Sequence, residues 1–452
     1  MLIRAIFKNI LSFGIQTEFN MLSAPRYTDH KSHKVKFNNI NILKFSAIYG
    51  ANGAGKSNLI KSILLFERLV KDEISLNKVR QKHNKFNNPE DSQVMGLEFI
   101  AENKRYLYAV ELHTNIISKE EIYRINKNGN QELLFKRETN IETLETNIET
   151  ILLDMKNEKD AYLIEIFIDN MLKTNKMSLE KFSELKHENL GELKNIIKWF
   201  EKLIIIEPNS RLPHIPYLLN KNEDLLKYFN NSMHSFNVGI DSIELSKDKL
   251  SDVVDDKKQC EEIIETLDSG IGKLAILKDE NGEQITIVKE EDEKKKEYFA
   301  YGLKTVHSHD NSKTTFSFEE ESDGTKRLFD LLSAFNTIVN EDSVVIIDEV
   351  ERSIHPVLIK KVLEKLTLNN NIKGQFLFTT HESNLLDLAL LRRDEIWFVE
   401  KNLKGNTEFY PLSDYQEHKT KDIRKGYLQG RYGAIPFLGN LDDLNWNISD
   451  VN

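Results

Sequence analysis

The sequence predicts an α/β fold in which a mixed sheet core is joined to an antiparallel N-terminal sheet and carries a helical insertion. Three observations predict it. An apolar run, a glycine-rich loop and a helix-periodic segment follow one another between residues 45 and 74. Short strand-like runs fill residues 95–135, as in an antiparallel meander. Continuous apolar runs near residues 344, 375 and 395 indicate strands buried on both faces.

The N-terminal part predicts two strand-rich segments. Residues 2–22 mix apolar and polar side chains at short spacing, which indicates a hairpin. Residues 21–39 are polar and predict a loop. The expected strands of the meander are residues 96–100, 106–112 and 121–125.

Residues 50–57, Gly-Ala-Asn-Gly-Ala-Gly-Lys-Ser, have the spacing of a phosphate-binding loop. The glycines let successive N–H groups point at phosphate oxygens, the lysine reaches the β- and γ-phosphates, and the hydroxyl can hold Mg²⁺. A strand before the loop and a helix after it aim the helix N-terminus at a phosphate. We therefore expect ATP and Mg²⁺ to bind here, with Ser57 as a metal ligand. The expected nucleotide-binding residues are Gly50, Asn52, Gly53, Ala54, Gly55, Lys56, Ser57 and Asn58.

Residues 138–151 contain a repeat, Glu-Thr-Asn-Ile-Glu-Thr-Leu followed by Glu-Thr-Asn-Ile-Glu-Thr-Ile. Its apolar members, Ile141, Leu144, Ile148 and Ile151, have the three-then-four spacing of a helix seam. Helical patterning continues to about residue 200, so we predict a helical insertion over 138–202. Core helices of the main domain are the alternative. The insertion would divide one head into an N-terminal part, 1–137, and a C-terminal part, 203–452.

The stretch after the insertion is harder to interpret. Residues 203–207 predict a strand that Pro208 ends. Further on, the runs 275–277 and 284–288 flank Glu280-Asn281-Gly282, which is a good hairpin turn. The rest of 208–315 gives no clear pattern.

Acidic residues and a histidine end two later strands. The apolar run 344–347 is followed by Asp348 and Glu349, and the run 375–380 is followed by His381. Ligands bind at the carboxyl ends of strands in open α/β sheets. Asp348 is therefore expected to hold the Mg²⁺ shell, Glu349 to activate the attacking water, and His381 to sense the γ-phosphate. A structural role is the alternative for His381. The run 395–399 completes the sheet.

Residues 321–325, Glu-Ser-Asp-Gly-Thr, precede an apolar helix. Small and hydroxyl residues at a helix N-terminus can form an anion site, although Ser and Asp are also the usual helix caps. Their position just before the Asp348 strand favours the anion site, with Ser322 and Gly324 as its main residues.

This order of motifs resembles the ATPase heads of the ABC/SMC/Rad50 class. The resemblance implies an ABC/SMC-type P-loop head in which Ser322 and Gly324 contact the ATP held by a second subunit. More narrowly, the chain resembles bacterial AAA/ABC-like ATPases of abortive-infection and phage-defence loci, such as AbiL-type ATPases and the ATPase subunit of the PARIS system. The matching segments are residues 8–13, 321–325, 348–356 and 427–437.

The sequence departs from the transporter branch of that class. The signature has Asp323 where ABC transporters have Gly, and the segment after Glu349 lacks the transporter pattern. A glutamine loop is not identified, although Gln93 is a candidate.

Composition narrows the class of protein. The 452 residues carry a net charge of −10, with 72 acids and 62 bases, which argues against non-specific coating of nucleic acid. A local basic groove is left open. One cysteine excludes an internal disulfide and a multi-cysteine zinc site. The sequence lacks a membrane-length apolar run and a signal-peptide pattern, so we expect a cytoplasmic protein without a membrane partner.

Three functions remain to be weighed. The first is a cytoplasmic ATPase that senses infection and, by ATP-dependent head dimerisation, controls an effector encoded by a neighbouring gene, such as a TOPRIM nuclease. The second is a DNA-repair ATPase of the SMC/Rad50/RecF kind, which predicts a long heptad insertion and a basic DNA track. The third, an OLD-type nuclease, needs a further domain after Phe437. We favour the first.

Overall fold

The structure is a computed structural model that describes residues 1–212, 214–268, 274–278, 284–292, 295–310, 312–415 and 422–435. The expected turn at 280–282 and the tail from Pro436 onward lie outside these residues. The chain forms two compact units. The first unit comprises Met1–Pro208, Ile338–Val350 and Val362–Asn452, and the second comprises Asn209–Thr337 and Glu351–Lys361.

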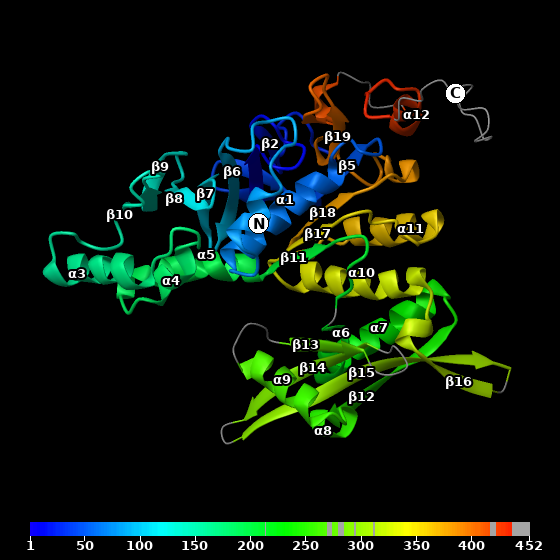
Figure 1. The fold of residues 1–452 in the computed structure, drawn as a ribbon. Coiled ribbons are helices and arrows are strands. Elements are labelled where there is room, and N and C mark those ends of the chain that lie inside the picture. The colour runs from blue at the N-terminus through cyan, green and yellow to red at the C-terminus, as the bar shows by residue number, and fades with distance from the viewer. Residues whose placement is uncertain are drawn as a thin grey trace, which may run out of the picture. The chain divides into compact units, whose positions relative to one another are not determined.

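A six-stranded sheet with the order β11-β17-β18-β5-β19-β20 forms the centre of the first unit (Figure 1). The first five strands are parallel, and β20 is antiparallel to β19. Strands β5, β17 and β18 and the first part of β19 are continuous apolar runs that are buried throughout, as expected of a sheet covered on both faces. The strands are β5 (Phe45–Gly50), β11 (Leu203–Ile206), β17 (Val344–Ile347), β18 (Gln375–Thr379), β19 (Ile396–Lys401) and β20 (Thr407–Pro411).

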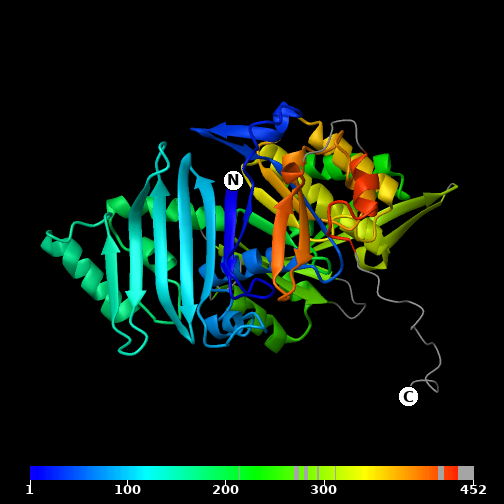
Figure 2. The ribbon, with the colours of Figure 1, turned by 90° about the horizontal axis from the view of Figure 1, so that it is seen from above.

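The predicted N-terminal hairpin and meander are confirmed as one antiparallel sheet with the order β10-β9-β8-β7-β6-β1-β2 (Figure 2). In β7 buried side chains alternate with half-buried ones, as a sheet with one well-covered face requires, whereas β6 is buried almost throughout. They are β1 (Leu2–Lys8), β2 (Thr17–Asn20), β6 (Gln93–Ala101), β7 (Lys104–His113), β8 (Ile116–Ile125), β9 (Gln131–Thr139) and β10 (Thr146–Thr150).

Helices α1 (Lys56–Val70) and α5 (Gly191–Glu201) cover this sheet. Phe99 of β6 stacks on Trp199 of α5 with ring centroids 4.1 Å apart, and Phe66 of α1 meets Phe200 edge-on at 5.8 Å. All four rings are buried. Each large aromatic side chain removed from water stabilises the unit by about 2–3 kcal/mol. This aromatic layer therefore fixes α1, and with it the loop at the start of α1.

The helix seam expected over residues 138–151 is wrong. The repeat forms the antiparallel hairpin β9–β10, in which Thr146 pairs with Thr139 and Thr150 with Phe135. Thr and Ile are β-branched and favour strands. Asn140 accepts hydrogen bonds from the N–H groups of Glu142 and Thr143 and so closes a turn where the seam required a helix.

Only the remainder of the predicted insertion is helical, and its apolar side chains join the core of the first unit. Its helices are α3 (Glu158–Ile166), α4 (Leu179–Glu184) and α5.

The second unit occupies the stretch that the sequence left largely unassigned. Its sheet has the order β12-β15-β14-β13, with β16 also paired to β15. The predicted pairing of 275–277 with 284–288 is confirmed as β13–β14. The expected C-terminal head part, 203–452, is therefore divided between the two units. The strands are β12 (Ile240–Lys249), β13 (Leu274–Lys278), β14 (Gln284–Asp292), β15 (Lys295–His309) and β16 (Ser312–Ser317); the helices are α6 (Ile215–Lys221), α7 (Glu223–Phe236), α8 (Leu250–Val253) and α9 (Lys257–Asp268).

The remaining strands and α-helices are β3 (Lys34–Phe37), β4 (Ile40–Leu43), α2 (Leu76–Arg80), α10 (Asp323–Asn340), α11 (Pro356–Thr367) and α12 (Ile423–Leu428). Of these, α10 precedes β17 and α11 follows it in the chain, and the others are short. Among the described residues, no helix combines the length and apolarity needed to cross a bilayer.

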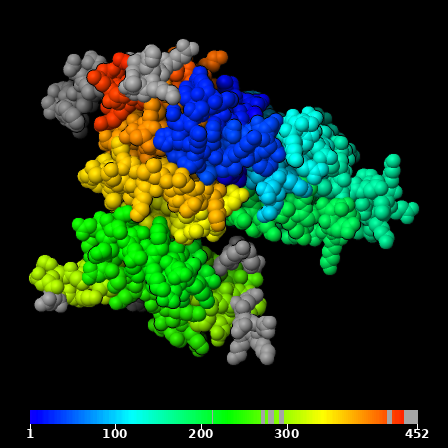
Figure 3. Space-filling model, turned by 180° about the vertical axis from the view of Figure 1, so that it is seen from behind, coloured from blue at the N-terminus to red at the C-terminus, as the bar shows by residue number. Residues whose placement is uncertain are grey.

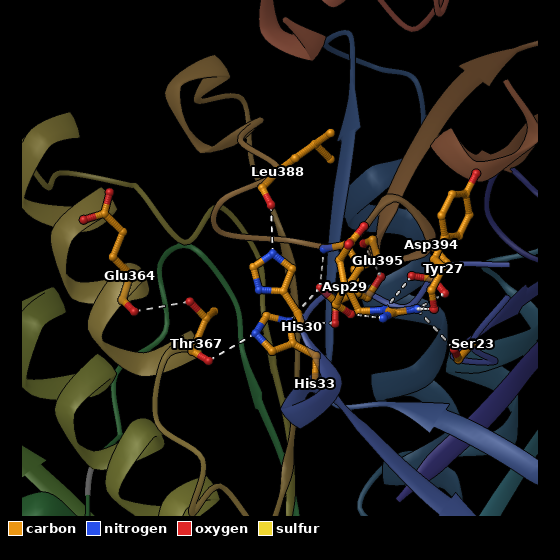
Figure 4. A network of polar contacts seen from close by, with 12 residues as sticks. Ser23, Tyr27, Asp29, His30, His33, Glu364, Thr367, Leu388, Asp394 and Glu395 are labelled. Atoms are coloured by element: carbon orange, nitrogen blue, oxygen red, sulfur yellow. Dashed lines mark hydrogen bonds and ion pairs between the residues drawn. The ribbon is translucent and has the colours of Figure 1, made fainter. Parts of the chain in front are cut away.

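The polar segment 21–39 is held down by a buried network that the sequence did not reveal (Figure 4). Its His33 lies with Nδ1 3.0 Å from Glu395 Oε2 and Nε2 3.1 Å from the carbonyl oxygen of Thr367. Arg392, equally buried, pairs with Asp394 and donates to the carbonyl oxygen of Tyr27. Burial raises the pKa of Glu395, and His33 opposes that shift. The network fixes the segment against the start of β19.

Candidate functional site

The glycine-rich loop joins β5 to α1, as predicted. Gly53 and Gly55 have φ of +76° and +116°, a region that side chains disfavour. A Cβ on Gly55 would also lie 2.2 Å from Thr407 Oγ1, and one on Gly50 would lie 2.5 Å from the carbonyl oxygen of Val399. No atom lies within 4 Å of the Cβ position of Gly53. The loop is therefore closely packed from behind and open at Gly53 and Asn52, which are exposed.

Lys56 begins α1, and its ammonium lies within the loop. Nζ donates to the carbonyl oxygens of Gly50 at 2.8 Å and Ala51 at 3.2 Å. His381, which follows β18, contacts the same Nζ through Nδ1 at 3.4 Å. The structure thus brings together two predicted site residues 325 positions apart. Ser57 and Asn58 occupy the first turn of α1 and are half-buried.

Two hydroxyl groups that the sequence analysis missed support the loop. Thr407 Oγ1 lies 2.7 Å from Ser12 Oγ and 2.8 Å from the carbonyl oxygen of Ala54. Asn58 Nδ2 donates to the same Ser12 Oγ at 2.8 Å. These contacts fix the back of the loop to residues near each end of the described chain, which explains why local sequence patterns could not reveal them.

The acids after β17 share one buried hydroxyl. Thr379 Oγ1 donates to Asp348 Oδ1 and accepts the N–H of Glu349 at 2.8 Å. Asp348 and Thr379 are fully buried, and Glu349 is half-buried. Glu349 has φ of +51°, an unfavourable value for a non-glycine residue. Such a backbone conformation costs of order 1–3 kcal/mol. The hydrogen bond from the Glu349 N–H to the Thr379 hydroxyl helps to offset this cost.

We expect Thr379→Val to lower the turnover of ATP about tenfold, because two hydrogen bonds that orient the acids are lost. ATP affinity should change little, since the loop is untouched. Steady-state kinetics would separate the two effects. Thr379→Ser should restore most of the turnover, and Thr367→Val, at a buried threonine of α11, is the matched control. Equal losses in the two valine variants would assign Thr379 a purely structural role.

The expected signature loop lies in the second unit, at the start of α10. Ser322 Oγ accepts the N–H of Thr325 at 3.1 Å and so caps the helix. A Cβ on Gly324 would lie 2.5 Å from the carbonyl oxygen of Ser353, so the close approach of two backbones requires glycine. Ser322 and Asp323 are exposed. Ser322 therefore caps α10 while both Ser322 and Asp323 stay accessible to solvent.

A histidine and a carboxylate anchor this loop. Glu321 Oε1 lies 2.6 Å from His307 Nε2 and also accepts the hydroxyl of Thr305, both on β15. The side chain of Glu321 is buried, whereas that of His307 is partly exposed. The sheet of the second unit therefore holds the residue immediately before Ser322.

Asp330, two turns along α10, is buried in the same unit. Burial raises its pKa to about 6, although the Leu212 N–H, Arg211 and Arg327 act in the opposite direction. The carboxylate lies 3.0 Å from the Leu212 nitrogen and 3.8 Å from Arg211. Because the pKa is above its ordinary value, the contribution of Asp330 to stability is greatest in acid and decreases as the pH rises through about 6.

The residues present fit a nucleotide with Mg²⁺. The parallel strands β17, β18 and β5 are neighbours, so Asp348, His381 and the glycine-rich loop follow strands that end at one edge of the sheet. Ser57 and Asp348 offer oxygen ligands, which Mg²⁺ prefers alongside phosphate oxygens. Among the described residues, no group of three His, Cys, Asp or Glu side chains could hold a metal by itself. Gln93, the glutamine-loop candidate, is fully buried at the start of β6, and no described contact joins it to Lys56.

The sequence profile of one protein family matches residues 45–387; that family is described as "AAA domain, putative AbiEii toxin, Type IV TA system". No curated protein matches the chain.

Among solved structures, the chain is similar to an SmcHead bound to the C-winged helix domain of ScpA, at 13% identity and a TM-score of 0.44, covering 91% of this chain and 97% of that one. It is also similar to the SMC head domain from Thermotoga maritima, at 14% identity and a TM-score of 0.37, covering 91% and 98%. A third similar structure is the Smc head domain with an extended coiled coil bound to the C-terminal domain of ScpA derived from Pyrococcus furiosus. The identity is 13% and the TM-score 0.43, and the match covers 91% of this chain and 96% of that one.

Proposed function

Because the chain belongs to the family described as "AAA domain, putative AbiEii toxin, Type IV TA system", we propose that it binds ATP with Mg²⁺, hydrolyses it, and uses the cycle to control a partner protein. One observation carries the proposal. The glycine-rich loop with Lys56, the acids after β17 and His381 after β18 follow adjacent parallel strands of one sheet.

Each residue has a distinct role in this proposal. The loop N–H groups and Lys56 bind the phosphates. Ser57 and Asp348 would hold Mg²⁺, which when bound would supply charge neutralisation at the phosphate oxygens. Glu349 orients and deprotonates the attacking water, and its partly exposed position suits a group that must meet water. His381 would reach the γ-phosphate, and its 3.4 Å contact with Lys56 supports that role.

The signature residues Ser322 and Gly324 would act on the ATP of a second copy of the chain. Three features support this arrangement: the two motifs lie in separate compact units, Ser322 is exposed, and Gly324 keeps the loop close to Ser353. Two ATP molecules would then join two heads, and hydrolysis would release them. Association of the heads is the event that could regulate a partner.

We place this cycle in a cytoplasmic antiphage system that acts by abortive infection. The description of the family as a putative AbiEii toxin of a type IV toxin–antitoxin system supports this setting. The chain would be the ATP-dependent regulator, and the effector would be a separate protein from a neighbouring gene.

Mixing two inactive variants tests the composite site. Ser322→Arg alone and Lys56→Ala alone should each be inactive, because every site in either homodimer contains a defect. In the mixed heterodimer one site carries both defects and the other carries none, so part of the ATPase activity should return. Activity would be measured against the mixing ratio, and ATP-dependent dimerisation by light scattering.

Strict cooperativity between two sites would suppress the recovered activity but not ATP-driven association. The proposed action of Ser322 and Gly324 on the ATP of a second copy would be excluded by three results together. The mixture would show no recovered activity, ATP would cause no association, and the wild type would hydrolyse ATP as a monomer. Ser251→Arg, at an exposed serine of α8, controls for the effect of an added surface arginine.

A further inference from the structure

The hairpin β9–β10 stands at one end of the seven-stranded sheet of the first unit, with β10 as the last strand (Figure 2). Strand β10 pairs with β9 on one side, and in the described part of the chain no backbone hydrogen bond leaves residues 146–150 on the other side. An edge strand presents unpaired N–H and C=O groups that can pair with another strand. The backbone of β10 is therefore available to a partner.

Large apolar side chains are exposed around this edge. A single exposed apolar residue is ordinary, but these fall within 22 consecutive residues of the hairpin and α3. In Figure 3 the teal atoms of this region project from the surface of the first unit. The side chains are Ile141 (41% exposed), Leu144 (52%), Ile151 (54%), Met155 (52%) and Tyr162 (62%).

The same region is strongly acidic. Residues 138–165 contain eight acids and two lysines, a net charge of −6. Within the described residues, only Glu138 and Asp160 of these acids lie within ion-pair distance of a basic group. Beside the β9–β10 turn is an open hollow of about 710 Å³ whose lining includes three acids, Glu111, Glu138 and Glu145, together with Lys119 and His113. Apolar contacts and uncompensated negative charge thus surround the free edge.

Two simpler explanations account for only part of these observations. Charged side chains such as Glu145 and Glu149 do protect a short edge strand from aggregation. Protection does not explain the exposed Leu144, Ile151 and Tyr162, which would promote aggregation. A cation site is also disfavoured. Among the described residues, no three His, Cys, Asp or Glu side chains lie close enough together to hold a metal ion.

We propose that β10 is the docking site for an extended basic segment of a partner protein, which pairs with β10 as an eighth strand. Main-chain hydrogen bonds would supply affinity, and side chains would supply specificity. Lysine or arginine side chains would face Glu145 and Glu149 on one face of the sheet, and the alternate apolar side chains, on the other face, would contact Leu144. The proposal does not depend on ATP hydrolysis.

The probe is a fluorescein-labelled peptide of eight alternating lysine and valine residues, added to the full chain without nucleotide. Binding by wild type is expected to weaken about tenfold in the double variant Glu145→Lys/Glu149→Lys, since two favourable charge contacts become repulsive. Leu144→Ser should also weaken it. The matched control, Glu261→Lys/Glu265→Lys on α9, has the same net charge and should change binding less than twofold.

Hydrogen exchange locates the peptide on wild type, so the test does not rest on variants alone. Amides of residues 146–150 should become protected when the peptide binds, and a glutamate–valine peptide should protect none of them. Protection elsewhere without protection of β10, or equal weakening in both charge-reversal variants, would overturn the proposal. A failure of ATP binding by wild type would leave this result unchanged, so the two failures are distinguishable.

Discussion

Replacing Lys56 by alanine is expected to abolish measurable ATP binding. Its ammonium lies within the loop, 2.8 Å from the carbonyl oxygen of Gly50, and its side chain is almost fully buried. Charge-assisted hydrogen bonds contribute about 1.5–3 kcal/mol each, so losing two to the phosphates weakens binding by at least about a hundredfold. Calorimetry with ATP and Mg²⁺ measures the loss.

The matched control is Lys61→Ala, at an exposed lysine of the same helix. It should bind ATP as wild type does. Micromolar affinity in Lys56→Ala would remove the phosphate-loop assignment. In cells that carry the chain with its neighbouring genes, Lys56→Ala should also lose protection in a phage plating assay. If Lys56→Ala loses ATP binding but still protects the cells, ATP-dependent regulation is rejected. The assignment of the ATP-binding site would still stand.

Glu349→Gln is expected to bind ATP normally and to hydrolyse it at least about a hundredfold more slowly, because general base catalysis contributes about 10²–10⁴-fold. The amide keeps the size of the side chain, and the N–H that Thr379 accepts belongs to the backbone. Geometry should therefore survive while the base is lost. Association of heads should accumulate with ATP.

Phosphate release and light scattering measure the two effects. The control is Glu341→Gln. Glu341 is an exposed acid that precedes the N-terminal end of β17, whereas Glu349 follows the C-terminal end, so this variant should retain wild-type turnover. Turnover of Glu349→Gln within a few-fold of wild type would assign the general base to another residue.

The sequence predicted those features in which local pattern and tertiary position agree. Continuous apolar strands followed by Lys56, Asp348 or His381 could be identified because a buried parallel strand and its polar C-terminal residue lie next to each other in the chain. The Glu-Thr-Asn-Ile repeat led to a wrong prediction because it carries two opposing signals. Its Ile and Leu residues, at spacings of three and four, suit a helix seam, whereas Asn140 and the β-branched residues favour the hairpin that forms.

The missed residues act over long separations. Thr379 contacts Asp348 across 31 positions, and Thr407 contacts Ser12 across 395. Threonine and serine occur throughout the chain, so their type alone does not distinguish them. Only the strand order, which places β18 between β17 and β5, gives Thr379 its partners.

That strand order also determines when the protein can become active during synthesis. Strand β5, which leads into the glycine-rich loop, lies between β18 and β19, and these begin at Gln375 and Ile396. A ribosome adding roughly 5–20 residues per second needs about 15–70 s to pass from Phe45, at the start of β5, to Gln375. Until Gln375 is made, β5 has neither of these strands to pair with, and Thr407, which lies behind the loop, is made later still. A nascent chain thus lacks a complete nucleotide site until Thr407 has been made, so chains shorter than this cannot engage longer ones through ATP.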